Sequence, residues 1–435
     1  MKKLLNVLTG VILLIAACGK NDPAPPEPEA PPAMFSDKIE LKQPKIEGDA
    51  VKLSWSILDN SNFYSYIILR KDTPDGLLAT VGEMVMDSRT TTILDEQVPY
   101  SPEVVYQIVG QVRNGAPIYS NTVSHKTAGV NLLNISPYDV IYNGTQQLLY
   151  FFEQNGRISM YDLKTEKIIK QIETKATTGY ADMESFNGKT ELYVPRNDGW
   201  IFVYDALTLE KITQITVGTE STSVVSQNNI LYVSTSSSSW PRGPLKVYRR
   251  ADRALITETG DYERTRLRKV PGSNTRLVEV TMFIGPTNQY FYEFTKEGSA
   301  IQLFTDRYHG DYPLDASIFA FFPNGSKYIT ASQGAIYNIN LTYDKSLPRG
   351  NLEYSDFCFD DAGQSIYAAT TGKSIEVYST SEYSHLKSIR TKAYPYKIFK
   401  TPQGILSVST MIKHSGQFSS YYPTHNKVLI EKLNP

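Results

Sequence analysis

The stretch Trp200-Ile201-Phe202-Val203-Tyr204-Asp205 decides the fold, because versions of it recur along the chain. The same pattern, an apolar strand that ends in tyrosine and is followed by a turn, recurs in Arg157-Ile158-Ser159-Met160-Tyr161-Asp162 and in Ser374-Ile375-Glu376-Val377-Tyr378-Ser379. The full set of strand-ending tyrosines is Tyr161, Tyr204, Tyr248, Tyr292, Tyr337, Tyr378 and Tyr421. Their spacing of 41 to 45 residues predicts a repeated structural unit.

Ahead of each copy lie an apolar strand, a polar turn and a second apolar strand. In one unit, Phe319 to Phe322 is followed by Pro323-Asn324-Gly325 and then by Tyr328-Ile329. Four short strands in a period of about 40–45 residues are the signature of a β-propeller. Seven such units fit residues 129–435, so we expect a seven-bladed β-propeller there.

The sequence pattern of the repeat resembles that of the YVTN-type and quinoprotein-dehydrogenase-like propellers. It lacks the Gly-His and Trp-Asp dipeptides of the WD family. The point of ring closure has two solutions. Either the last strand, Lys427 to Glu431, completes the seventh unit alone, or Asn131 to Ile135 joins it as a closing strand.

Residues 35–128 show a different pattern of alternating strands and turns. Val51 to Trp55 and Tyr64 to Arg70 are candidate strands. Val104 to Val112 is expected to pair with the following strand across Asn114-Gly115, a strong hairpin signal.

This segment resembles a fibronectin type III domain. Trp55 stands where that family has its core tryptophan, and Leu94 with Tyr106 matches the spacing of its tyrosine corner. The resemblance implies a β-sandwich that serves as a spacer or docking module. The expected fold class is therefore all-β, a sandwich followed by a propeller.

The N-terminus has the pattern of a targeting segment. Lys2 and Lys3 precede an apolar stretch that is too short to span a bilayer. Ile15-Ala16-Ala17-Cys18 resembles the lipobox of bacterial lipoproteins, in which the cysteine is acylated after cleavage. The alternative is an ordinary signal peptide that contains a cysteine.

We expect a signal peptide at 1–17, a lipid on Cys18 and an extended Pro-rich tether over 18–34. The resemblance to lipoproteins of the Bacteroidota type implies a lipid anchor in the outer membrane of the cell envelope. The sequence does not decide whether the anchored protein lies on the periplasmic or on the cell-surface face of this membrane.

Composition excludes several classes of protein. The 44 Lys and Arg balance 45 Asp and Glu, which argues against a purely electrostatic nucleic-acid binder. Two cysteines cannot form a disulfide scaffold. The five histidines are scattered, and HExxH, GxSxG and GxGxxG motifs are absent from the sequence, so we assign no catalytic residue, metal or cofactor.

Aromatic residues in expected loops supply the candidate binding face. Flat rings with a few charges suit a glycan or a protein loop. Tyr180 and Tyr396 have packing between repeats as an equal alternative, and Arg266 and Lys397 are among the polar partners. The candidate residues are Trp200, Trp240, Tyr262, Tyr308, His309, Tyr312, Tyr394 and Arg264.

Two functions follow from this pattern. The first is a membrane-tethered binding module that recognises a glycan or a partner protein. The alternative is a lactonase-, lyase- or dehydrogenase-like propeller enzyme with a metal or cofactor at the central channel. Its acids would come mainly from Asp182, Asp315 and Asp356.

Overall fold

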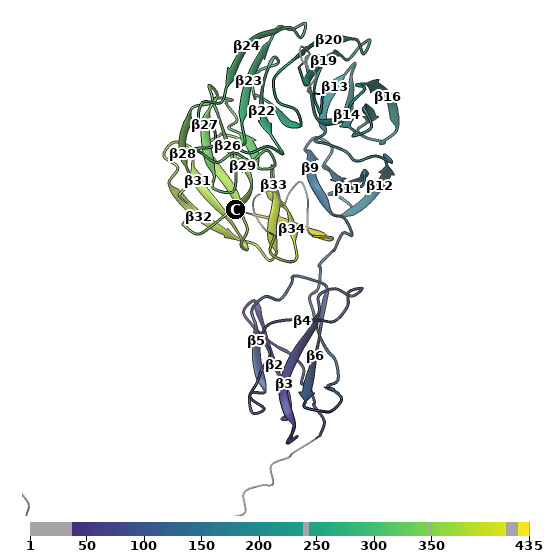
Figure 1. The fold of residues 1–435 in the computed structure, drawn as a ribbon, viewed down its shortest axis with the longest axis vertical. Coiled ribbons are helices and arrows are strands. Elements are labelled where there is room, and N and C mark those ends of the chain that lie inside the picture. Colours follow the sequence, from purple (N-terminus) through teal and green to yellow (C-terminus); the bar gives the residue numbers. More distant parts are fainter. Residues whose placement is uncertain (1–36, 238–242, 349, 415–424, 435) are drawn as a thin grey trace, which may run out of the picture.

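The computed structural model describes residues 37–237, 243–348, 350–414 and 425–434. It is all-β and consists of many small antiparallel sheets. Figure 1 shows a narrow unit built from residues up to about 128 and a rounded array of sheets built from the rest. Within these described ranges, the chain forms no helix long and apolar enough to cross a membrane.

The narrow unit contains two sheets. The first consists of β1 (Lys45–Glu47), β2 (Ala50–Ser54) and β5 (Thr92–Asp95). The second consists of β3 (Phe63–Lys71), β4 (Ala79–Thr80), β6 (Glu103–Val112), β7 (Ile118–Tyr119) and β8 (Val123–Lys126). Their shared core includes Trp55, whose ring packs edge-on against Tyr66 at 5.3 Å. The expected hairpin is present, since β6 pairs with β7 across a turn in which Asn114 has a φ of 58°.

Tyr106 and Leu94 have different environments. Tyr106 is buried, and its hydroxyl donates to Asp95 Oδ2 at 2.8 Å, where Arg70 also donates. Leu94 is 44% exposed and pairs with Lys52. Side chains alternate along a strand, and in β5 the partly buried ones are Ile93 and Asp95. Leu94 therefore does not take the core position that the resemblance implied.

The rounded array begins with three four-stranded sheets, each a meander in sequence order. The first contains β9 (Pro137–Asn143), β10 (Leu148–Glu153), β11 (Arg157–Asp162) and β12 (Lys167–Glu173). The second contains β13 (Asp182–Phe186), β14 (Lys189–Pro195), β15 (Trp200–Asp205) and β16 (Lys211–Thr216). The third contains β17 (Ser221–Gln227), β18 (Ile230–Thr235), β19 (Leu245–Arg249) and β20 (Leu255–Thr259).

Three more meanders of the same kind follow. The fourth contains β21 (Thr265–Lys269), β22 (Arg276–Thr281), β23 (Gln289–Phe294) and β24 (Ala300–Thr305). The fifth contains β25 (Phe319–Phe321), β26 (Lys327–Thr330), β27 (Ala335–Asn338) and β28 (Tyr343–Ser346). The sixth contains β29 (Tyr354–Phe359), β30 (Ser365–Thr370), β31 (Ser374–Ser379) and β32 (His385–Arg390).

The repeated tyrosines occupy equivalent places in these sheets. Each lies on the third strand of its sheet and is buried. Tyr421 lies outside the described residues. The repeated tyrosines that lie on third strands are Tyr161, Tyr204, Tyr248, Tyr292, Tyr337 and Tyr378.

Burial differs between the strands of a sheet in a regular way. The second strands are buried along most of their length, and β10 is a nearly continuous apolar run that is buried throughout. The fourth strands, such as β12 and β24, are mostly exposed. A strand needs a continuous apolar run only when both faces of its sheet are covered, so each sheet extends from a packed interior to a solvated rim.

The last sheet is completed by both ends of the array. It contains β33 (Tyr394–Thr401), β34 (Gly404–Thr410) and β35 (Val428–Leu433), and Leu133 adds an antiparallel bridge to Val428 at its outer edge. Of the two expected modes of closure, the structure therefore has the one in which the segment around Leu133 joins the final strand.

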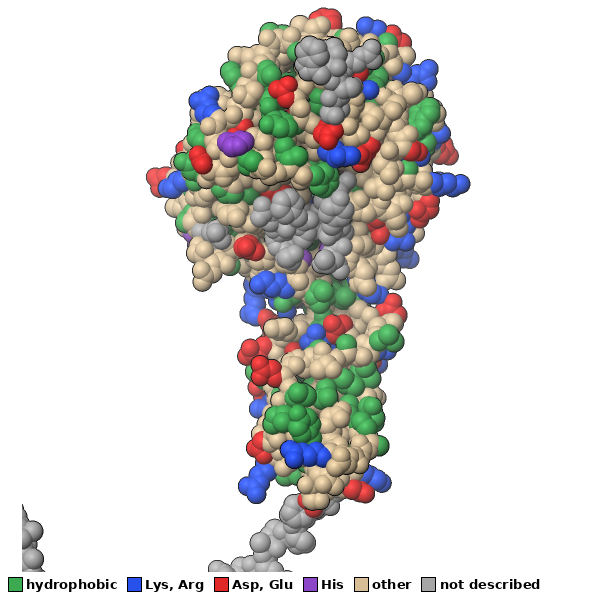
Figure 2. All heavy atoms as spheres, viewed as in Figure 1, with side chains coloured by type: hydrophobic (Ala, Val, Ile, Leu, Met, Phe, Trp, Pro, Cys, Tyr) green, Lys and Arg blue, Asp and Glu red, His purple; other side chains and the backbone are tan. Residues whose placement is uncertain are grey.

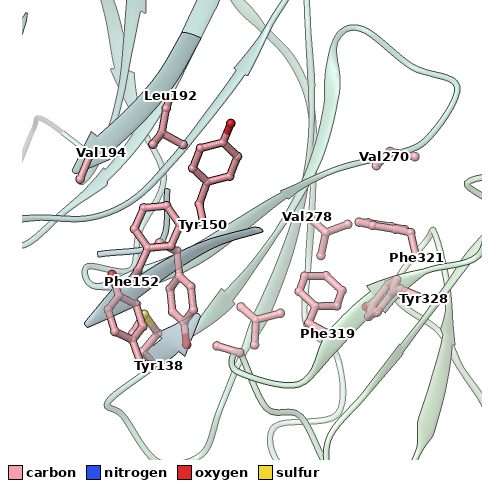
Figure 3. Close-up of a cluster of buried hydrophobic side chains, with 14 of the residues drawn as sticks. Tyr138, Tyr150, Phe152, Leu192, Val194, Val270, Val278, Phe319, Phe321 and Tyr328 are labelled. Carbon is pink, nitrogen blue, oxygen red and sulfur yellow. The ribbon is translucent and has the colours of Figure 1, made fainter. Parts of the chain in front are cut away.

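Neighbouring sheets pack face to face through large apolar side chains. Figure 3 shows one group in which Tyr150 and Phe152 of β10 lie near Leu192 of β14, and a second group around Phe319 and Tyr328. Two first strands also approach closely beside Gly179, where an added Cβ would lie 2.2 Å from the carbonyl oxygen of Thr222. Glycine is required at this point because no other residue leaves room for the neighbouring backbone.

The narrow unit contacts the array through ion pairs and through Tyr100, which packs against Ala393, Met411 and Leu429. Lys427 Nζ lies 2.7 Å from the carboxylate of Asp75, and Arg390 pairs with Asp49. A cavity of about 500 Å³ lies between the two parts, and Tyr100 and Lys392 are among its lining residues.

Candidate binding site

A cavity of about 500 Å³ lies where the first strands of all seven sheets meet. Each of these strands contributes side chains to its wall. One representative from each strand, in chain order, is Asp139, Asp182, Val225, Arg268, Ala320, Asp356 and Lys397. The cavity is therefore the common centre of the array, and residues far apart in the sequence face one another across it.

Two of the carboxylates hold neighbouring sheets together. Asp182 Oδ2 accepts a hydrogen bond from the backbone N–H of Ser226 at 2.7 Å, and Asp356 Oδ2 accepts one from that of Ile398 at 2.9 Å. Each bond joins the first strand of one sheet to the first strand of the next. Burial raises the pKa of Asp356, against the opposing effect of Lys397.

Arg266 is a basic residue with a full set of protein partners. Its guanidinium donates to the carbonyl oxygens of Ala316 at 2.9 Å and Ser317 at 3.2 Å, and it lies 3.4 Å from Asp139. It also stacks on the ring of Tyr180, with 3.8 Å between the guanidinium carbon and the ring centroid. Arg266 therefore ties several strands together at the wall of the cavity.

Tyr180 and Tyr396 are packing residues. Both are buried, and Tyr396 donates to the backbone oxygen of Tyr138 at 3.3 Å while its ring contacts His425. The Tyr138 hydroxyl in turn donates to Gly179 O at 2.6 Å. Of the two alternatives that the sequence left open for Tyr180 and Tyr396, the structure supports the one in which they fill space between repeats.

Three of the predicted aromatic-face residues lie together. Tyr308, His309 and Tyr312 belong to the connection between β24 and β25. The ring of Tyr312 packs edge-on against Tyr308 at 4.9 Å and stacks on Tyr343 at 3.8 Å, and Tyr312 and His309 are exposed. We call Tyr308, His309, Tyr312 and Tyr343 the surface tyrosine group.

Tyr262 and Arg264 lie apart from this group, in the connection between β20 and β21, and each has its own partner. The ring of Tyr262 packs against buried Tyr290 at 5.2 Å. Arg264 pairs with Glu220 at 3.0 Å. The position of Tyr262 is therefore partly explained by packing.

The remaining predicted residues are placed differently from expectation. Trp200 is the first residue of β15 and Tyr394 the first of β33, so neither lies in a loop. Tyr394 lies beside Lys373, near the narrow unit. Trp240 lies outside the described residues. The structure therefore provides several local groups where the sequence predicted one aromatic face.

The carboxylates of the enzyme alternative are also divided. Asp182 and Asp356 line the cavity, whereas Asp315 is buried and accepts hydrogen bonds from the N–H and hydroxyl of Ser317 at 2.8 and 2.6 Å. Burial raises the pKa of the Cys358 thiol, which lines the same cavity. In the described part of the chain, no three residues among His, Cys, Asp and Glu are grouped so that they could hold a metal ion.

Comparison with known proteins adds no assignment. The chain matches no protein-family model and shows no significant similarity to a curated protein. Its function is therefore inferred from the geometry of the site.

Sequence reasoning did not single out Arg268. The available signal was the run Arg266-Leu267-Arg268-Lys269, which places three cations in one first strand. Arg266 and Lys397 were expected in loops, but they belong to β21 and β33.

Proposed function

We propose that the chain is a lipid-anchored binding protein of the cell envelope. Cys18 would carry the lipid, and residues 18–34 would form the tether. A fibronectin type III-like sandwich would act as a spacer. A seven-bladed β-propeller would then present the binding site to a glycan.

The sheet topology supports the propeller. Successive four-stranded meanders whose first strands meet at one centre, and a final sheet joined by Leu133 from the start of the array, are features of a propeller. The sandwich is supported by its two sheets and by the buried Trp55, while the exposed Leu94 departs from the family pattern.

The convergence of all seven first strands on one cavity carries the functional proposal. A concave site of this volume buries most of a small ligand, and polar groups in its wall fix the orientation of that ligand. The wall combines carboxylates and cations with partly exposed apolar side chains such as Phe399. A sugar presents hydroxyl groups and flat apolar faces together, so it suits this wall better than a protein loop does.

Protection of Cys358 from alkylation tests the proposal. In a Cys18→Ser background, Cys358 is the only thiol of the chain and lies in the cavity wall. A bound glycan should slow its reaction with a small alkylating reagent. The matched control carries Cys358→Ser and Lys387→Cys, which moves the thiol to an exposed position on β32. A panel of glycans that never protects Cys358 would refute binding in the cavity.

A further inference from the structure

We infer that the ligand of the central cavity carries a carboxylate group and that Arg268 binds it. This inference rests on the proposed function and specifies the chemical class of the ligand. It comes from a cation in the cavity wall that has no partner among the residues that the structure describes.

Arg266 and Arg268 are neighbours on one side of β21, because side chains alternate along a strand. Arg266 has protein acceptors and an aromatic partner, as described above. By contrast, no hydrogen bond or ion pair within the described ranges reaches the guanidinium of Arg268. The two arginines of this strand therefore have different roles. Arg266 holds neighbouring strands together, whereas the N–H groups of Arg268 are available to a ligand in the cavity.

The wall carries two more cations than carboxylates, and one of the two has an acidic partner outside the wall. Five basic side chains line the cavity, against three carboxylates. Arg266 lies near Asp139, Lys269 near Asp182 at 2.9 Å, and Lys397 near Asp356 at 4.0 Å. Lys400 lies 3.8 Å from Asp361, which is not a cavity residue. Among the described residues, this pairing leaves Arg268 unmatched.

The surroundings of Arg268 disfavour its charge. Burial and the neighbouring Arg266 lower the pKa of Arg268 to about 10, although the carboxylates of Asp139, Asp356 and Asp182 act in the opposite direction. The guanidinium remains charged at neutral pH. An incoming anion would therefore relieve a cost that is already present in the unliganded protein.

A single unmatched cation selects a group with one negative charge. A guanidinium fork matches the two oxygens of a carboxylate through parallel hydrogen bonds. A phosphate dianion would need a second free cation, which the described wall does not offer. The carboxylate is therefore the group that fits both the charge and the shape of Arg268.

The rest of the wall indicates what bears this carboxylate. Asp139, Asp182 and Asp356 offer acceptor oxygens to hydroxyl groups, and the partly exposed side chains of Met183 and Phe399 offer apolar surface. A hydroxylated ring with a carboxylate, such as a uronic acid, uses both kinds of surface. A cavity of about 500 Å³ has the size of a small-molecule site.

Titration calorimetry with galacturonate, galactose and acetate on the full chain tests this inference. The variants are Arg268→Gln, Arg268→Lys and the matched control Arg276→Gln, which removes an exposed arginine from the adjacent strand β22. Native protein should bind galacturonate more tightly than either galactose or acetate. Arg268→Gln should weaken galacturonate binding about tenfold or more, Arg268→Lys should weaken it less, and Arg276→Gln should leave it unchanged.

Thermal unfolding of the same variants separates a binding role from a structural one. Removal of an unpaired cation should leave the melting temperature of Arg268→Gln unchanged or raise it. A lower melting temperature, unchanged galacturonate binding by this variant, or equal binding of galactose by the native protein would each overturn the carboxylate inference. In those cases Cys358 protection by a neutral glycan would still support the proposed function, and its absence with every glycan would refute both.

Discussion

Leu133 and Val428 form two backbone hydrogen bonds with each other. Leu133 N donates to Val428 O at 2.8 Å, and Val428 N donates to Leu133 O at 3.1 Å. Both side chains are buried in the same cluster. The segment that enters the array of sheets is therefore bonded to the strand that ends it, and the last sheet is held by both.

Removal of the Leu133 N–H should weaken this closure. Leu133→Pro deletes the donor and leaves Val428 O without its partner, whereas Leu133→Ala deletes only side-chain contacts. We expect Leu133→Ala to lower the free energy of unfolding by about 2–5 kcal/mol. Leu133→Pro should lower it by about 1–3 kcal/mol more. Denaturant unfolding measures both, and equal stabilities of the two variants would show that the bridge contributes nothing.

Glu279 on β22 is a buried carboxyl whose replacement should stabilise the protein. Neither of its oxygens has a hydrogen bond of good geometry in the described part of the chain, although the hydroxyls of Thr265 and Tyr292 lie near. Burial raises the pKa of Glu279 to about 8. Glu279→Gln keeps the shape and removes the ionisation, so it should raise the free energy of unfolding by about 3 kcal/mol at pH 7.

The pH dependence of that gain has a definite sign. An acid whose folded pKa is raised keeps its proton in the folded protein while the unfolded chain ionises, so stability falls as pH rises from about 4.5 to about 8. The advantage of Glu279→Gln should therefore grow across this window and vanish below it. Glu293→Gln on β23, which removes the partner of Arg276, should show no such growth. A gain for Glu279→Gln that is constant with pH would contradict the assignment.

Tyrosines of the repeat and of the surface tyrosine group should differ in their contribution to stability. Tyr204 is buried on the third strand of its sheet, so Tyr204→Ala should cost about 3–5 kcal/mol. Tyr312 is 36% exposed and stacks mainly on Tyr343, so Tyr312→Ala should cost only about 1 kcal/mol. Thermal unfolding that gives equal losses would mean that the surface tyrosine group is part of the core.

The sequence was informative where local pattern determines structure. The strand-ending tyrosines predicted the third strands because each repeat buries the same position against its neighbour. Asn114 predicted a hairpin turn because it tolerates a positive φ. The alternation in β5 was the signal that Leu94 faces outward, and the resemblance to a known family overrode it.

The central site was beyond local reasoning. Asp139 and Arg266 are neighbours only because the sheets follow one another around a common centre. Figure 2 shows cations and anions interspersed over the visible surface, so surface charge gives no indication of the cavity either. The unmatched state of Arg268 depends on which carboxylates face which cations, and that requires the full three-dimensional arrangement.

The proposed lipid anchor depends on Cys18, which lies outside the described residues. Cys18→Ser should abolish incorporation of a labelled fatty acid and release the protein from the membrane fraction, or leave an uncleaved precursor. Cys358→Ser, which removes the other cysteine of the chain, should retain both the label and the membrane association. A processed Cys18→Ser protein that still fractionates with membranes would contradict the lipoprotein assignment.

A crystal structure of the full chain with a bound uronic-acid oligosaccharide tests the central claim most directly. The account predicts electron density for a sugar in the cavity formed by the first strands, with its carboxylate about 2.7–2.9 Å from the guanidinium nitrogens of Arg268. Asp139, Asp182 or Asp356 should accept hydrogen bonds from its hydroxyl groups. Density for the sugar on the surface tyrosine group alone, with the central cavity filled only by water, would contradict the account.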